Sequence, residues 1–179
     1  MNILNADKNH IAAIQAIYAH HVSTGLGSFE TLPPSAEEMA SRIAKVQQEG
    51  LIWLVAEMDG CVMGYCYLSF YRTRYAYRYT LEDSVYVAAD YQGRGVGKTL
   101  LQHAIDWAQQ QGYRQMIANV GNSENHGSLA LHESLGFTLC GTLHSVGLKH
   151  GQWLDTVFLQ RELGEGDRTL PDNAASMSR

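Results

Sequence analysis

The stretch from Glu82 to Thr99, E-D-S-V-Y-V-A-A-D-Y-Q-G-R-G-V-G-K-T, decides the fold and organises the rest of the chain. Ser84–Val87 is a run of β-branched and aromatic residues, which predicts a strand. Apolar residues then recur at helical spacing over Val96–Ala108, which predicts an amphipathic helix. A glycine-rich loop joins the two. Because the first N–H groups of a helix lack partners and carry the positive end of its dipole, the sequence predicts an anion site at this loop.

Three patterns of phosphate-binding loops can be compared with the glycine-rich segment. The dinucleotide pattern G-x-G-x-x-G fails, because its last glycine falls on Lys98 or on Leu100. The P-loop pattern G-x-x-x-x-G-K-[ST] fits at its end, but its first glycine falls on Gln92. The pattern Q-x-x-G-x-G fits throughout, and it consists of Gln92, Gly93, Arg94, Gly95, Val96 and Gly97. From the residues alone, an ordinary glycine-rich turn without a ligand remains the alternative.

This Q-x-x-G-x-G loop resembles the acetyl-CoA pyrophosphate loop of the GNAT N-acetyltransferase superfamily. The resemblance implies that acetyl-CoA is the co-substrate and that backbone N–H groups of the loop hold its diphosphate. Arg94 and Lys98 are expected to add positive charge there. The resemblance also implies that the backbone of Val85, Tyr86 and Val87 pairs with the pantetheine amides, as an added strand does.

The composition limits the class of protein. A chain of 179 residues with 45% apolar and 17% charged residues predicts one globular domain. The net charge of -5 argues against nucleic acid as a partner. No apolar run approaches the roughly 20 residues of a membrane-spanning helix, and no signal peptide is evident. The three cysteines form no C-x-x-C and leave an odd count, which predicts a reduced, cytoplasmic protein.

The expected elements follow the order β-α-α-β-β-β-α-β-α-β-β, which predicts an α/β fold with a mixed sheet. Asp59-Gly60 predicts a two-residue hairpin, and residues 137–159 predict a second hairpin that turns near His150-Gly151. This order resembles that of the GNAT acyl-CoA N-acyltransferase fold, which is a mixed, mostly antiparallel sheet flanked by helices. We therefore expect one domain over residues 1–163 and a polar, disordered tail over residues 164–179.

The segment Thr80–Val87 narrows the resemblance to the phosphinothricin N-acetyltransferase family, because T-L-E-D-S-V-Y-V fits the family run T-x-E-x-[ST]-V-Y-V. Three further segments resemble motifs of that family in the same order: an F-x-T substrate loop with Phe29 and Glu30, a second CoA helix with Asn125 and Ser128, and a K-H-G-x-W-x-D hairpin over Lys149–Asp155. Four separated motifs in one order are far more specific than any single motif.

The resemblance gives Glu82 and His132 their expected catalytic roles. Acyl transfer needs a neutral amine, because an ammonium group has no lone pair, and in the family the glutamate at this place is taken as the general base. From its place before the predicted strand, a solvated glutamate is the alternative. His132 matches a histidine often placed in the active site. It can protonate the CoA thiolate, orient Glu82 or merely pack on the sheet. Asn125 can bind pantetheine or cap its helix.

The segment Phe70–Tyr79, F-Y-R-T-R-Y-A-Y-R-Y, is rich in arginine and tyrosine. At a period of two, its three arginines share one face and its tyrosines the other. Since a guanidinium group binds a carboxylate through two parallel hydrogen bonds, this face predicts an anion site, with a solvated basic strand edge as the alternative. The family resemblance implies substrate binding by Arg72, Arg74, Tyr75, Ala76 and Tyr77, whereas family members vary at Arg78.

Together these residues predict a cytoplasmic N-acetyltransferase that uses acetyl-CoA and no metal. Its expected substrate is the α-amine of a small amino-acid analogue, such as phosphinothricin, methionine sulfoximine or methionine sulfone, acetylated by direct transfer. The resemblance also implies a homodimer. The alternatives are acetylation of a peptide N-terminus or a protein lysine, a CoA-binding regulator without catalysis, and an ATP-binding protein that uses the near-match to the P-loop.

Overall fold

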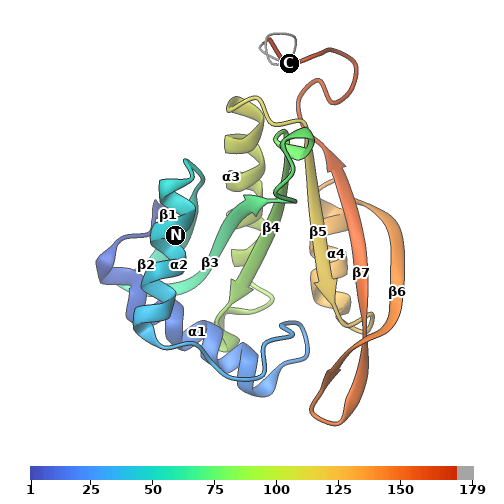
Figure 1. The fold of residues 1–179 in the computed structure, drawn as a ribbon. Helices are drawn as coiled ribbons and strands as arrows, with labels where there is room; N and C mark the ends of the chain where they lie inside the picture. The colour runs from blue at the N-terminus through green and yellow to red at the C-terminus, as the bar shows by residue number, and fades with distance from the viewer. Residues whose placement is uncertain (173–179) are drawn as a thin grey trace.

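The computed structural model describes residues 1–172 and shows a seven-stranded sheet with helices on both faces (Figure 1). The strands are β1 Asn2–Asn5, β2 Trp53–Met58, β3 Cys61–Phe70, β4 Thr80–Val87, β5 Gln115–Gly121, β6 Thr138–Lys149 and β7 Gln152–Glu162. The helices are α1 Ile11–Thr24, α2 Ala36–Gln48, α3 Val96–Gln110 and α4 His126–Ser134, with short 3-10 turns at Lys8–His10, Tyr75–Tyr77 and Ala89–Tyr91. No helix among these residues is long and apolar enough to cross a membrane.

The sheet has the strand order β1-β2-β3-β4-β5-β7-β6, and all neighbours are antiparallel except β4 and β5. The prediction of a mixed, mostly antiparallel sheet flanked by helices is therefore confirmed. The parallel pair is short, because β4 and β5 pair only from Thr80 opposite Gln115 to Asp83 opposite Ala118. Beyond that point the two strands diverge and leave a V-shaped gap in the middle of the sheet (Figure 1).

The helix starts follow from the capping residues in the sequence. The Asp7 side chain accepts a hydrogen bond from the Asn9 N–H and caps the 3-10 turn that leads into α1. The Ser35 side chain accepts from the Glu38 N–H and caps α2. The hairpin predicted at Asp59-Gly60 is also present, and both of its residues have a positive φ.

The core lies between α3 and the sheet, and a second apolar layer lies under α1 and α2. The face of α3 that meets the sheet is fully buried and consists of Val96, Leu100, Leu101, Ala104, Ile105 and Ala108. On the opposite face of the sheet, stacked aromatic rings from β2, β3 and β4 meet α1. Within that layer the Tyr86 ring lies 5.1 Å from the ring of Tyr18. Successive residues of β4 therefore face opposite layers.

The segment after β7 differs from the expectation of a disordered tail. In the described part, residues 164–172, the chain forms turns. The Arg114 side chain donates hydrogen bonds to the backbone carbonyls of Gly166 and Thr169. A polar composition therefore did not prevent this part from packing on the domain, where one arginine binds two of its carbonyl groups. Residues 173–179 lie outside the described residues.

Candidate active site

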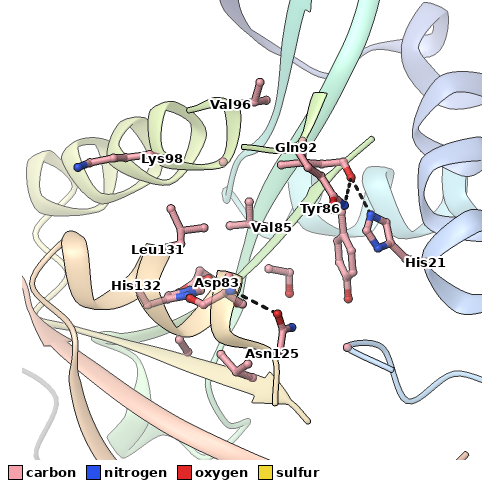
Figure 2. Close-up of a pocket in the computed structure, with 18 of the residues that line it drawn as sticks. His21, Asp83, Val85, Tyr86, Gln92, Val96, Lys98, Asn125, Leu131 and His132 are labelled. Atoms are coloured by element: carbon pink, nitrogen blue, oxygen red, sulfur yellow. Dashed lines mark hydrogen bonds and ion pairs between the residues drawn. The ribbon is translucent and has the colours of Figure 1, made fainter. Parts of the chain in front are cut away.

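A cavity of about 520 Å³ lies at the gap between β4 and β5 (Figure 2). Its walls come from both diverging strands, the glycine-rich loop, the first turn of α3 and the helix α4. Twelve of the residues predicted to act in catalysis or CoA binding line it: Val85, Tyr86, Val87, Gln92, Gly93, Gly95, Val96, Gly97, Lys98, Asn125, Ser128 and His132. The structure thus brings together three motifs that lie up to 49 residues apart in the chain, as from Asp83 to His132.

The glycine-rich loop presents backbone N–H groups at the start of α3. Gly93 and Gly95 have φ values of 71° and 80°, a left-handed conformation that favours glycine. Gly95 is the N-cap of α3 and offers no side chain to the first N–H groups of the helix. Those groups have no side-chain partner at the helix start, which is the arrangement that suits an anion. Arg94 differs from expectation, because it does not line the cavity and its guanidinium group lies over the Tyr91 ring, 5.6 Å from the ring centre.

The carbonyl group of Val87 at the end of β4 is already bound within the protein (Figure 2). The His21 ring donates to it from Nε2 over 2.8 Å, and the Gln92 side chain donates from Nε2 over 3.4 Å. The short bond from His21 occupies one lone pair of this oxygen, and the longer contact from Gln92 lies at the second, so little accepting capacity is left for a pantetheine amide. Burial lowers the pKa of His21 despite this hydrogen bond, which favours the neutral ring.

His132 pairs with Asp83 and not with Glu82. Its Nε2 atom lies 2.8 Å from Oδ1 of Asp83, and its Nδ1 atom lies 2.7 Å from the Ser128 carbonyl oxygen. Both side chains are buried and both line the cavity. Burial by itself lowers the pKa of His132, but the Asp83 carboxylate and the two hydrogen bonds together raise it. Of the roles considered for His132, the orientation of Glu82 has no contact to support it.

Glu82 lies inside β4 rather than before it, opposite Ser69 on β3 and Ile117 on β5. Its side chain is half-buried on the face of α1 and α2, which is the face of Tyr86, whereas Asp83 faces α4. Glu82 does not line the cavity, although Ser84, the next residue on the same face, does. Burial, followed by the negative charge of Asp83, raises the pKa of Glu82 above its usual value.

The loop that carries Phe29 and Glu30 closes one end of the cavity. Gly27 and Ser28 line it, and the buried Lys149 ammonium group donates to the Ser28 carbonyl over 2.7 Å. The Phe29 ring packs so closely on Gly147 that a Cβ atom added there would lie 2.4 Å from the ring. Phe29 therefore anchors the loop, and neither it nor Glu30 reaches the cavity wall.

Glu30 is engaged by Arg42 of α2 through two hydrogen bonds of 2.7 and 3.2 Å. Burial would raise the pKa of Glu30, but the contacts with Arg42 and Tyr18 lower it below its usual value. The carboxylate is thus ionised and already has a counter-ion. This geometry gives Glu30 a part in fixing the loop, since its charge is neutralised within the protein.

The prediction of a strand face of three arginines after Phe70 is wrong. The pairing of β3 with β4 ends at Phe70 opposite Leu81, so residues 71–79 must reverse the chain and cannot keep a two-residue alternation. They form turns and the 3-10 turn Tyr75–Tyr77 before β4 begins. The Arg78 guanidinium group stacks on the Tyr75 ring at 4.1 Å.

Arg72 and Arg74 nevertheless line one pocket, together with Thr73 and Tyr77. This separate hollow lies just before the start of β4, whereas the glycine loop follows the end of β4. Tyr75 and Ala76 do not line it, and none of its residues lines the cavity between β4 and β5. Within one chain, the expected carboxylate site and the expected CoA site are therefore distinct.

Sequence reasoning missed Asp83, His21 and Arg42. Asp83 occupies a variable position of the T-x-E-x-[ST]-V-Y-V run, so the motif gives no indication of a role for it. Strand alternation carried through from Tyr86 would have placed it on the helix face opposite Glu82. His21 lies on α1 and Arg42 lies on α2, and the apolar stripe of each helix accounts for its segment as a helix that packs on the core. No local pattern therefore marks either residue as functional. In residues 1–172 no group of three His, Cys, Asp or Glu side chains is arranged to hold a metal ion.

Comparisons with known proteins agree with this geometry. The profile of the acetyltransferase (GNAT) family matches residues 14–137. The chain is 56% identical to a phosphinothricin N-acetyltransferase of Alcaligenes faecalis over 162 residues, which are 90% of this chain and 82% of the relative. It is 38% identical to an L-methionine sulfoximine/L-methionine sulfone acetyltransferase of Salmonella typhimurium over 165 residues, 92% of this chain and 96% of the relative.

Among solved structures, a GNAT superfamily phosphinothricin acetyltransferase of Sinorhizobium meliloti in complex with AcCoA superposes with a TM-score of 0.93 at 40% sequence identity. The match covers 97% of this chain and 94% of that structure. Four sequence motifs, the gap between β4 and β5, and these similarities lead to one conclusion. The chain belongs to the GNAT acetyltransferase family and, within it, to the group of phosphinothricin and methionine sulfoximine/sulfone N-acetyltransferases.

Proposed function

We propose that this protein transfers the acetyl group of acetyl-CoA directly to the α-amine of a small amino-acid analogue of the phosphinothricin, methionine sulfoximine or methionine sulfone type. The observation that carries the proposal is the cavity at the β4–β5 gap, which ends on the free N–H groups of the glycine loop. A panel of amino-acid analogues, assayed for release of free CoA, tests the substrate class. Isothermal titration with acetyl-CoA and with ATP tests the ligand, and binding of ATP alone would contradict the proposal.

The residues of the cavity offer a CoA molecule three points of contact. The amides of residues 95–98 suit a diphosphate, because they have no acceptor within the helix and sit at its positive end. The backbone of Val85 has β3 on one side and the open gap on the other, so it suits the pantetheine amides. Asn125 caps α4 by accepting from the Ser128 N–H over 3.3 Å, which leaves its amide N–H groups for a ligand.

Acetyl-CoA supplies the activated acetyl thioester, and the protein supplies the base. The Glu82 carboxylate lies on the face of the sheet under α1 and α2, two residues before Ser84 at the edge of the gap. At about 3.3 Å per residue along a strand, its backbone lies roughly 7 Å from that of Ser84, and Glu82 itself does not line the cavity. We therefore propose that it deprotonates the amine through one water molecule. The amine thus approaches from the α1 and α2 side of the gap.

Arg74 is proposed to hold the carboxylate of the amino acid, together with Arg72 in the hollow at the start of β4. Replacing Arg74 by alanine is expected to raise the KM for the amino acid about tenfold, because a charge-assisted hydrogen bond is lost, while the KM for acetyl-CoA stays unchanged. Arg78→Ala is the matched control, since Arg78 stacks on Tyr75 outside the hollow. Steady-state kinetics measures both. An unchanged amino-acid KM in Arg74→Ala would exclude the clamp.

A homodimer is proposed because the outermost strand β6 carries exposed apolar side chains. Leu148 and its cross-strand neighbour Trp153 are 59% and 67% exposed, and Leu139, Leu143 and Val146 are also exposed. An apolar edge of this kind is typical of a surface that a second copy covers. The separate hollow of Arg72 and Arg74 fits this arrangement, because a partner subunit can bring that hollow to the cavity.

Leu148→Asp is expected to convert the dimer into a monomer, because the new charge loses its hydration when the surface is covered. Light scattering coupled to size-exclusion chromatography measures the mass in solution. Leu4→Asp on β1 is the control, since Leu4 is a 40% exposed leucine on the opposite edge of the sheet. A monomeric wild-type protein, or a dimer that persists in Leu148→Asp, would contradict this interface.

We also propose a cytoplasmic location, which fits the unpaired Cys61, Cys66 and Cys140.

A further inference from the structure

The buried pair of Asp83 and His132 has a hydrogen-bonding geometry that fixes its proton content. The Ser128 carbonyl oxygen, 2.7 Å from Nδ1 of His132, carries no hydrogen, so Nδ1 must be protonated and donate. The 2.8 Å contact between Nε2 and Oδ1 of Asp83 also requires one proton between the two atoms. The pair therefore holds two protons and carries no net charge. It consists either of an imidazolium ring with a carboxylate or of an imidazole ring with a carboxylic acid.

The surroundings of the pair favour the imidazolium with the carboxylate. Among the described residues, Asp83 is the charged group whose field raises the pKa of His132, against the effect of burial. From β3 the pair faces the neutral Cys66 thiol, and burial followed by the Asp83 charge raises the pKa of that thiol. Glu82 lies on the other face of β4, where burial, followed by the Asp83 charge, raises its pKa. Beside α4 the ring meets the Phe137 ring edge to face, 4.9 Å away, which holds no competing charge.

The second oxygen of Asp83 adds an independent observation. Oδ2 is sealed from solvent and has no hydrogen-bond donor among the described residues. With no donor at Oδ2, the charge of an ionised Asp83 can be offset only by a cation at Oδ1, because an unpaired buried charge is strongly destabilising. The His132 ring is the group in contact with Oδ1. An ionised Asp83 therefore requires a positively charged His132, and removal of the Asp83 charge should return the ring to its neutral form.

We propose that Asp83 is a positioning residue that holds His132 in the cavity wall as a doubly protonated ring, with both N–H groups committed to protein acceptors. This inference rests on the proposed function and deepens it. It assigns His132 a fixed positive charge beside the CoA site, rather than the role of a proton donor to the departing sulfur. The amine enters in its neutral form, having lost its first proton to solvent. When its nitrogen bonds to the acetyl carbon and the carbon–sulfur bond breaks, the second proton of the nitrogen passes through the water to Glu82, which later returns it to solvent. The sulfur leaves as a thiolate and is later protonated by solvent.

The protonation state of His132 can be measured directly by ¹⁵N NMR of the histidine rings in the free protein. In the wild type we expect both ring nitrogens of His132 to be protonated at pH 7. In Asp83→Asn we expect a neutral ring with the proton on Nδ1, because the new side-chain amide can donate to Nε2 but supplies no charge. The pH at which the ring loses its proton should fall by roughly 1–3 units, the usual effect of removing an adjacent opposite charge.

Asp106→Asn is the matched control, since Asp106 lies on the exposed side of α3, where it contacts Gln102, and the change removes the same charge. Its His132 signals should equal those of the wild type. A neutral His132 in the wild type at pH 7 would overturn the proposal even if Asp83→Asn did not fold. An unchanged His132 in a folded Asp83→Asn would also overturn it.

Steady-state kinetics provides a second measurement, which would stay unchanged if Asp83 had only a structural role. Since a neutral His132 cannot supply charge, the pH profile of kcat in Asp83→Asn should fall on its basic side at a lower pH than in the wild type. Unchanged profiles in a folded variant would contradict the charge role. If the NMR result is as expected while no amine is acetylated by the wild type, the proposed function fails and the assignment of Asp83 stands.

Discussion

Replacing Glu82 by glutamine is expected to lower turnover roughly 10²- to 10⁴-fold, the usual contribution of a positioned general base. Glutamine keeps the shape of the side chain but cannot accept a proton from the amine. Binding of acetyl-CoA should be unchanged, because Glu82 lies outside the cavity wall. Turnover at saturating substrates and titration of acetyl-CoA measure the two quantities. Wild-type turnover in Glu82→Gln would remove this residue from the mechanism.

The pH dependence offers a further check on the same residue. Burial and the charge of Asp83 raise the pKa of Glu82, and a base works only when it is deprotonated. The wild-type kcat/KM should therefore rise with pH through a pKa above the usual range of a glutamate. Glu82→Gln should lose this acidic limb. A matched control is Glu133→Gln, because Glu133 is an exposed glutamate of α4 outside the cavity wall.

In Glu82→Gln the thermal stability at pH 7 should rise although the turnover falls. A carboxyl group whose pKa is raised in the folded state stabilises the fold in its protonated form, and this contribution is lost as the pH rises from the unfolded-state pKa to the folded-state pKa. Above that window the ionised Glu82 destabilises the protein, whereas glutamine does not. Glu82→Gln should hence have a higher Tm than the wild type at pH 7 and the same Tm at a pH below both values.

The fold was largely predictable, because its signals are local. Ser35 and Asp7 are strong N-caps, Asp59-Gly60 is a hairpin turn, and the glycines of the loop mark the start of α3. Each of these is satisfied by residues within a few positions, so the sequence alone carries the information. The position of the cavity was predictable for the same reason, because β4, the glycine loop and α3 follow one another directly in the chain.

The parts that were not predicted depend on contacts between distant elements. The alternation of tyrosine and arginine predicts a strand face for Arg72 and Arg74, but the antiparallel pairing of β3 with β4 forces a reversal of the chain. Asp83 became visible only when α4 placed His132 against it, 49 residues away. Glu30 was assigned to substrate, yet Arg42 of α2 neutralises it. Such ion pairs depend on how helices pack, and no local pattern records them.

Replacing Gly97 by valine is expected to weaken acetyl-CoA binding roughly 10- to 100-fold, which corresponds to the 1–3 kcal/mol that overpacking typically costs. Gly97 lies in the first turn of α3 and lines the cavity. A Cβ atom at this position would lie 3.3 Å from Cδ2 of Leu131 on α4 and 3.4 Å from Cγ2 of Val87 on β4. It just fits, so the two further methyl groups of valine must either enter the cavity or push α3 away from β4.

Two features make this substitution a selective test of where acetyl-CoA binds. Gly97 has no positive φ, so valine adds steric bulk without backbone strain at the glycine turn itself. Gly141→Val on β6 is the control, because Gly141 also lacks a positive φ and a Cβ atom there has no neighbour within 4 Å. Isothermal titration measures both affinities, and circular dichroism checks that both variants fold. An affinity in folded Gly97→Val equal to that of Gly141→Val would mean that acetyl-CoA does not occupy the gap between β4 and β5, because valine at this point leaves too little space for it beside Leu131 and Val87.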